Sequence, residues 1–248
     1  MADPIKQFEI KTLIPLEAGG LDLSFTNSSL WMAIATILSI ALFSYGISKK
    51  SLVPGRMQMF VEMFYEFVSS MIRDSMGSKG KQFFPLIFSL FLMVLMGNLL
   101  GLIPGSFTFT SHIIVTGALA LMIFFFVIFV GIYRHGFAFF SLFSPPGVPL
   151  ILKFLVVPIE LISFFVRPLT LSVRLFANMM AGHLVLKVFA GFSASMLSLG
   201  MLGVAAAFVP MAFNVLMIAF EVLVALLQAY VFAILSAIYL NDTIEIDH

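Results

Sequence analysis

The chain has 248 residues, of which 61% are hydrophobic and only 10% are charged, and its formal net charge at pH 7 is +1. A soluble domain carries about 25% charged residues, so this composition indicates an integral membrane protein built from apolar helices. The small net charge gives no reason to expect a nucleic-acid partner, the lack of cysteine in the sequence excludes disulfides and thiolate sites, and four scattered histidines make a poor metal site.

The first part of the chain predicts one membrane span followed by an interfacial helix. Residues 1–29 form a polar segment and residues 30–48 form the first span. The stretch from Lys49 to Lys81 holds six of the thirteen basic residues, so the positive-inside rule puts it in the cytoplasm and the amino terminus on the periplasmic side. Within it, residues 55–75 carry charged side chains on one helical face and aromatic and methionine side chains on the other. This pattern predicts a helix lying along the membrane interface.

Four more apolar segments follow, and the last two are unusually long. Residues 83–103 and 112–133 each match one span, and the turn-rich sequence SLFSPPGVP then interrupts the pattern. Residues 204–240 would form a helix about 55 Å long, against about 30 Å of hydrocarbon, and residues 150–189 are similar. Each long segment is either a helical hairpin or one strongly tilted helix. Lone prolines without a turn cluster favour the tilted helix.

These segments predict an all-α integral membrane protein with about five membrane-embedded helices and one interfacial amphipathic helix. We expect residues 1–248 to form a single integral membrane domain, with a polar tail at 241–248. A long tilted helix suits a protein that lies against a large curved partner.

Polar residues recur at intervals of seven along both long segments. Seven residues advance a helix by about 700°, so such residues form one slowly turning line. The first line contains Lys153, Glu160, Arg167 and Arg174, with Ser163, Thr170 and Asn178 close to it. The second contains Asn214, Glu221 and Gln228.

Several polar residues have a structural interpretation. Lys153 and Arg167 are interpreted as anchors whose charged ends reach the membrane surface. Asn98, inside the second span, is interpreted as an interhelical hydrogen-bonding residue. The same interpretation is open for the three amides Asn178, Asn214 and Gln228.

Arg174 and Glu221 indicate function, because each is isolated in apolar sequence and has no partner of opposite sign one turn away. An ionisable residue inside a membrane is costly and marks a functional site by default. An arginine does not release its proton, so Arg174 can only attract an anion or repel a cation. Glu221 and His183 can exchange protons, and His183 lies about 180° around the helix from Arg174, toward the final segment.

At these residues the sequence resembles a known family. PLTLSVRLFANMMAGH, NVLMIAFEVLVALLQAYVFAILSAIYL and MGNLLGLIPGSFTFTSH are similar to segments of subunit a of the rotary ATP synthase membrane sector, and PIKQFEIKTLIPL is similar to the amino-terminal stretch of alphaproteobacterial and mitochondrial-type members. The resemblance covers most of the chain.

The resemblance implies a proton-conducting stator subunit that is not an enzyme by itself and needs no cofactor. It implies two offset half-channels beside a ring of c subunits, with Arg174 facing the ring between them and Gln228 orienting the arginine. The entry-side acid–base positions fall on His183 and Glu221, with Asn214 nearby. Many bacterial members have the histidine and the carboxylate exchanged, so we expect the pair to lie close together. The exit-side positions fall on Glu160 and Ser163, and Asn178 lines the arginine site.

The implied partners are the c-ring, the peripheral-stalk b-type subunits, the rest of the complex and membrane lipid. The implied location is the bacterial inner membrane, with the carboxyl terminus in the cytoplasm. The His–Glu pair favours a proton over sodium as the coupling ion. One alternative is a secondary transporter with a charged substrate site, although such folds usually show paired repeats. Another is a structural scaffold, which would not need a lone arginine.

Overall fold

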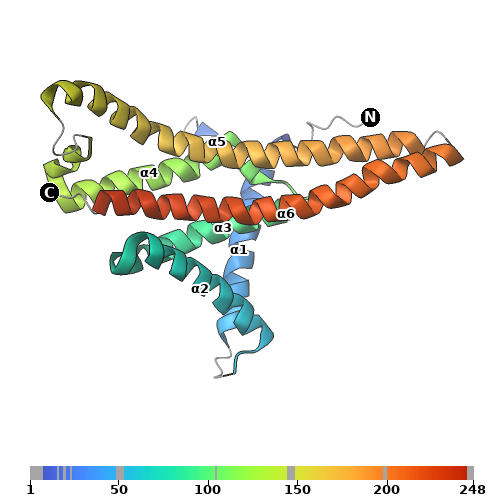
Figure 1. Ribbon diagram of the computed structural model, residues 1–248. Coiled ribbons are helices and arrows are strands. Elements are labelled where there is room, and N and C mark those ends of the chain that lie inside the picture. Colours follow the sequence, from blue (N-terminus) through green and yellow to red (C-terminus); the bar gives the residue numbers. More distant parts are fainter. Residues whose placement is uncertain are drawn as a thin grey trace. The chain divides into compact units, whose positions relative to one another are not determined.

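The protein is described by a computed structural model that covers residues 8–15, 17–18, 21–22, 24–48, 53–103, 105–143, 149–197 and 200–244. Lys49 and Lys50, most of the predicted proline break and the last four residues of the predicted tail lie outside these ranges. Over the described residues the chain is almost entirely helical, and five helical stretches are long and apolar enough to cross a membrane. The prediction of an all-α membrane protein is confirmed (Figure 1).

The helices follow the predicted segments with small shifts at their ends. α1 is Asn27–Ser48, α2 is Arg56–Met76 and α3 is Phe84–Gly101. A 3-10 segment, η2, joins α2 to α3 over Gly77–Phe83. After α3 come η3 at Phe109–Ser111, α4 at Ile113–His135 and η4 at Gly136–Phe143.

Both long segments are single helices. α5 is Leu150–Leu197 with 48 residues, and α6 is Met201–Ile244 with 44 residues. Pro158, Pro168 and Pro210 lie inside these helices without ending them, as prolines in membrane helices commonly do. The hairpin alternative is therefore excluded. Helix α5 continues to Leu197, eight residues beyond its predicted end at 189, and residues 190–197 contain no proline.

The polar amino-terminal segment contains short strands that the sequence did not predict. β1 (Thr12–Ile14) pairs antiparallel with β4 (Phe25–Thr26), and β2 (Glu17–Ala18) pairs with β3 (Leu21–Asp22). Asn27 links these strands to α1, because its side chain accepts from the Lys11 amide at 3.2 Å and donates to the Glu9 carbonyl at 3.2 Å.

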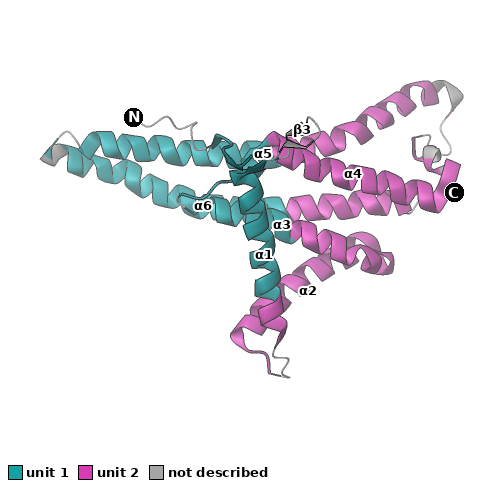
Figure 2. Ribbon diagram, turned by 180° about the vertical axis from the view of Figure 1, so that it is seen from behind, with its two compact units in different colours: residues 1–43, 92–112, 175–229 teal, residues 44–91, 113–174, 230–248 magenta. Residues whose placement is uncertain are grey.

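The chain divides into two compact units, shown in different colours in Figure 2. Unit 1 contains residues 1–43, 92–112 and 175–229, and so holds the second part of α5 and the first part of α6. These two parts pack side by side, with the rings of Phe189 and Phe213 at 4.3 Å between centroids. The chain leaving α3 folds back onto that helix, because Gly101 has no side chain to keep Thr108 away.

Unit 2 contains residues 44–91, 113–174 and 230–248. Its core includes an aromatic cluster from α4, η4 and α5, formed by Phe124, Phe139, Phe143 and Phe164. The hydroxyls of Thr116 and Ser172 lie 3.1 Å apart and join α4 to α5. The first part of α5 and the last part of α6 therefore belong to a different packing unit from their other ends.

Candidate functional site

Glu221 is the most deeply buried acidic residue among those described, and its carboxyl group has few polar neighbours. The residue is 3% exposed, and neither carboxyl oxygen has a hydrogen bond within the described part of the chain. Nε2 of His183 lies 3.8 Å from its Oε1 atom. The predicted proximity of these two residues is confirmed. A buried acid facing an imidazole can hand a proton to it or take one from it.

Gly182 brings the backbone of α5 close to this carboxyl group. A Cβ atom at Gly182 would lie 2.5 Å from Oε1 of Glu221 and 2.9 Å from its Cδ. Any larger residue would therefore push the carboxyl group away from its present position. The glycine lets α5 and α6 approach each other at the level of the His183–Glu221 pair.

His183 also contacts the segment that follows α3. Its Nε2 atom lies 3.0 Å from Oγ1 of Thr108, and that hydroxyl is 3.3 Å from the Gly101 carbonyl oxygen, to which it donates. A hydroxyl has one proton, so while Thr108 donates to Gly101 it accepts from the N–H of His183. Nε2 thus lies between a hydroxyl and a carboxyl group.

A cavity of about 330 Å³ lies next to His183 in unit 1. Its polar lining comes from the end of α3 and the following loop, from α5 and from α6. These lining residues are Ser106, Thr108, His183, Lys187 and Asn214. The cavity has room for several water molecules and enough polar groups to hold them. His183 lines it and Glu221 does not, so among the described residues the imidazole is the group that links the cavity to the acid.

The buried side chain of Asn98 and the amide oxygen of Asn214, both in unit 1, lack the interhelical hydrogen bonds that the sequence suggested, among the described residues. Asn98 is 0% exposed, and neither its oxygen nor its nitrogen has a hydrogen-bond partner among the described residues. The buried oxygen of Asn214 also lacks a partner there. The prediction that Asn98 bonds between helices is wrong. Polar groups of this kind are commonly satisfied by buried water, which suits a neighbourhood that already holds a polar cavity.

Arg174 stands at the end of the unit 2 part of α5, and its side chain is exposed. Within the described residues no carboxylate lies within salt-bridge distance of its guanidinium group. Asn178 and Gln228 are half-buried and belong to unit 1, whereas Arg174 belongs to unit 2. Contacts within either unit do not test the expected pairing of Arg174 with Gln228, which stays a prediction.

Arg167 differs from its predicted role as a surface anchor, because it is paired within the protein. Its guanidinium group donates to Oδ2 of Asp242 at 3.0 Å, lies 3.7 Å from Oε1 of Glu160 and sits 5.2 Å from the centroid of the Tyr239 ring. The acid that pairs with it comes from the last turn of α6. Arg167 therefore ties α5 to α6 in unit 2, while Ser163 on the same helix remains exposed.

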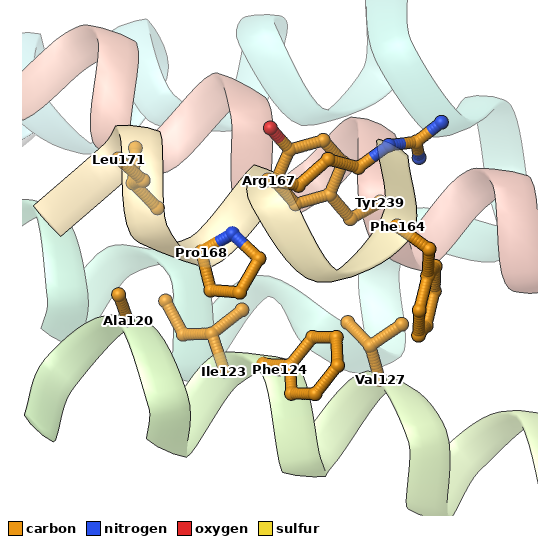
Figure 3. A pocket seen from close by; sticks show the side chains of 9 residues that line it. All are labelled: Ala120, Ile123, Phe124, Val127, Phe164, Arg167, Pro168, Leu171 and Tyr239. Atoms are coloured by element: carbon orange, nitrogen blue, oxygen red, sulfur yellow. The ribbon is translucent and has the colours of Figure 1, made fainter. Parts of the chain in front are cut away.

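A small apolar cavity of about 20 Å³ lies beside this cluster, with room for about one water molecule (Figure 3). Ala120, Ile123, Phe124 and Val127 of α4 form one side of it, and Arg167 and Tyr239 lie on the other. The guanidinium end of Arg167 points past the tyrosine ring and away from the cavity.

Sequence reasoning missed four residues at these sites: Thr108, Gly182, Lys187 and Asp242. Lys187 had a signal, because it follows His183 by one helical turn. Gly182 directly precedes His183, but a glycine in a membrane helix has many possible reasons. Thr108 and Asp242 reach their partners only through the fold, across 75 residues in each case.

The fold and these residues define a class of protein: a multi-pass helical membrane protein with an acid–imidazole pair beside a polar cavity and an arginine that has no acidic partner among the described residues. Residues 29–241 match the family described as ATP synthase A chain. Proteins named ATP synthase subunit a are 55% identical in Mesorhizobium japonicum and 57% identical in Chelativorans, and each alignment covers 99% of this chain and at least 98% of the relative. The Agrobacterium fabrum protein of that name is 55% identical over 99% of both chains. The chain belongs to the ATP synthase A chain family.

Proposed function

We propose that the chain is the proton-conducting stator subunit of an ATP synthase, with two offset half-channels that lead to a ring of rotor subunits. The observation that carries this proposal is the His183–Glu221 pair, held 3.8 Å apart at the inner side of a polar cavity. Relatives of more than 50% identity, each named ATP synthase subunit a, support the same role.

The entry half-channel begins at the polar cavity in unit 1. Water in the cavity delivers a proton to His183, whose Nε2 lies between Thr108 and Glu221, and the imidazole passes a proton to the deprotonated carboxylate of Glu221. Glu221 then passes the proton to a carboxylate on the rotor. Asn214 lines the same cavity and supplies an amide that can hold water in place. Proton entry from this cavity fits the predicted topology, in which the end of α5 and the start of α6 face the periplasm.

Arg174 separates the two half-channels. Because an arginine keeps its proton, protons cannot pass through its position and must travel on the rotor. The guanidinium group attracts each deprotonated rotor carboxylate as it arrives; two unit charges 4 Å apart attract by about 4 kcal/mol at an effective dielectric constant near 20. That attraction is comparable with the energy of one proton crossing, about 2.3 kcal/mol per 100 mV, so water near the arginine is needed for release. Gln228 would orient the arginine, and Asn178, one turn after it in the sequence of α5, would line its site.

The exit half-channel runs along the other part of α5. Glu160 and Ser163 lie there, and both are accessible in the single chain. Arg167, which pairs with Asp242 at 3.0 Å, lies 3.7 Å from Glu160 and attracts this exit-side acid. A proton released from the rotor would meet Glu160 on its way out.

The remaining partners and the orientation follow from the same role. The chain would contact the rotor c subunits, b-type subunits of the peripheral stalk and membrane lipid in a bacterial inner membrane. Five crossings would leave the two termini on opposite sides of the membrane, and the positive-inside rule supports an amino terminus in the periplasm and a carboxyl terminus in the cytoplasm.

The test is proton transport by the complex with Glu221→Gln. This change keeps the shape of the side chain and removes its acid–base chemistry, so ATP-driven proton pumping by inverted membrane vesicles should fall sharply while the complex still assembles. Glu66→Gln is the matched control, because Glu66 is an exposed carboxylate on α2 outside the proposed path. Equal pumping by the two variants would show that Glu221 only packs.

A secondary transporter is the competing function, and copurification distinguishes the two. The proposed subunit should be isolated in mild detergent together with a small, very apolar subunit that forms rings. Isolation of the chain alone, with full transport of a solute, would favour the transporter.

A further inference from the structure

Unit 2 contains a second polar hollow that the proposed proton path does not use. It has a volume of about 750 Å³ and lies where α2, η2 and the start of α3 meet. Its lining combines two cations, two serines and apolar or aromatic side chains. These residues include Ser69, Arg73, Ser78 and Lys81 on the polar side, and Tyr65 and Phe84 on the other.

The two cations come from different elements and are brought to one hollow by a tight turn. Gly77 ends α2 with φ of 59°, a left-handed conformation that favours glycine, and its N–H donates to the Arg73 carbonyl. Gly80 then packs directly on α2, since a Cβ atom there would lie 2.6 Å from Cγ2 of Ile72. The 3-10 segment therefore lies against the end of α2, and Arg73 and Lys81 line the same space.

The side chains described as lining this hollow carry a net positive charge. Among the described residues, neither Arg73 nor Lys81 has a carboxylate within salt-bridge distance, and both side chains are exposed. The hollow itself has no acidic lining residue in the part of the chain that is described. Glu62 and Glu66 line a separate, adjacent hollow of about 550 Å³, which shares Arg73. The basic hollow thus offers two positive charges and two serine hydroxyls to one ligand.

The surroundings of the hollow indicate the source of that ligand. α2 carries exposed Met57, Met59, Phe60 and Met63 among its charged residues, as an interfacial helix does. The first residues of α3, Phe84 and Pro85, line the hollow, and α3 then continues as an apolar membrane helix. The hollow therefore lies at the level where lipid headgroups meet hydrocarbon.

We propose that this hollow binds the headgroup phosphate of an anionic phospholipid, in the leaflet on the side of the basic stretch 49–81. Arg73 and Lys81 pair with the phosphate, and the hydroxyls of Ser69 and Ser78 donate to its oxygens. The acyl chains run along the exposed apolar surface beside Phe84. Basic clusters at the edge of a membrane span recognise anionic lipids in this way. The proposal does not depend on the proton path.

The experiment uses the purified ATP synthase complex in phosphatidylcholine vesicles that contain a phosphatidylglycerol with a photoreactive group near its phosphate. After illumination, mass spectrometry should find the probe on residues 65–85. Unlabelled phosphatidylglycerol should compete, whereas added phosphatidylcholine and inorganic phosphate should not. Competition by inorganic phosphate at equal concentration would identify a free-anion site and overturn the lipid assignment.

Two matched double variants test which charges matter. Arg73→Gln with Lys81→Gln should weaken labelling by up to about thirtyfold, because each direct ion pair with the phosphate contributes up to about 1 kcal/mol. Arg56→Gln with Lys79→Gln removes the same charge from the same basic stretch, outside the residues that line the hollow, and should leave labelling unchanged. Equal loss in both would show general surface attraction and contradict a built site.

Two further outcomes keep the test decisive. If the first double variant does not assemble, Lys81→Gln alone should lower labelling by up to about fivefold, from the loss of one direct ion pair. If a short cross-linker joins Lys81 to a peripheral-stalk subunit and the lipid probe does not label residues 65–85, a protein occupies the hollow and the proposal is wrong.

Discussion

Gly182→Ala tests whether the position of the Glu221 carboxyl group controls proton entry. A Cβ atom at this position would lie 2.5 Å from Oε1 of Glu221, and ordinary contact begins near 3.4 Å. The carboxyl group must therefore move by roughly 0.9 Å, the difference between these distances. The atom that moves is the end of a flexible side chain, so the cost to folding is small. The geometry of proton transfer changes more, because a displacement of about 1 Å in a reacting group can cost on the order of a hundredfold in rate.

The assay compares ATP-driven proton pumping and respiration-driven ATP synthesis in membrane vesicles, with the amount of assembled complex measured in parallel. We expect normal assembly and a loss of pumping of up to about a hundredfold in the alanine variant. Gly191→Ala is the matched control on the same helix, because a Cβ atom there meets nothing within 4 Å. It should pump at the wild-type rate.

A rescue separates displacement of the acid from other effects of the methyl group. Aspartate is one methylene shorter than glutamate, so Gly182→Ala with Glu221→Asp gives the carboxyl group room beside the new methyl group. Pumping should rise above that of Gly182→Ala alone. Pumping by Gly182→Ala equal to that of Gly191→Ala would refute the claim that the close approach of α5 to Glu221 sets the proton path.

The remaining predictions concern three charged pairs or sites. Arg174→Ala should abolish proton-driven ATP synthesis, and Arg174→Lys should also fail because an ammonium group lacks the planar donor fork; full synthesis in Arg174→Ala would remove the assigned role. His183→Glu combined with Glu221→His should restore part of the proton pumping lost in each single variant, whereas a double variant no better than either single one would count against direct exchange between them. In a double-mutant cycle on the thermal stability of the complex, Arg167→Gln and Asp242→Asn should show a coupling of at most about 1 kcal/mol. The coupling is small because the two side chains are 29% and 41% exposed, and solvent screens exposed ion pairs. Additive effects would mean that the 3.0 Å contact contributes nothing to stability.

The sequence predicts the helices well because the apolar segments are long and their boundaries are polar. It also predicts that α5 and α6 are continuous, since lone prolines do not turn a membrane helix back on itself. The spacing of polar residues every seven positions identifies Glu221 and points His183 toward the final helix. The distance of 3.8 Å between them depends on how closely the two helices meet, and the periodicity of one helix does not determine that separation.

The contacts that the sequence could not predict are those made by residues with several equally good partners. Arg167 could have reached the membrane surface, and only the fold brings Asp242 to it from the end of α6. Asn98 could have bonded to another helix, yet its amide meets no partner among the described residues. Thr108 lies in a loop with no periodic pattern, so its contact with His183 had no signal in the sequence.

The central claim is that Arg174 blocks a direct route between two half-channels, so that protons must ride on the rotor. The most direct measurement is proton flux through the membrane sector while a covalent cross-link fixes the rotor to the stator. An imposed potential of about 100 mV drives the flux and is worth about 2.3 kcal/mol per proton. With wild-type protein the flux should be absent, and with Arg174→Ala the protons should leak across the fixed rotor. Flux through the fixed wild-type complex, or a variant that stays as tight as wild type, would contradict the account.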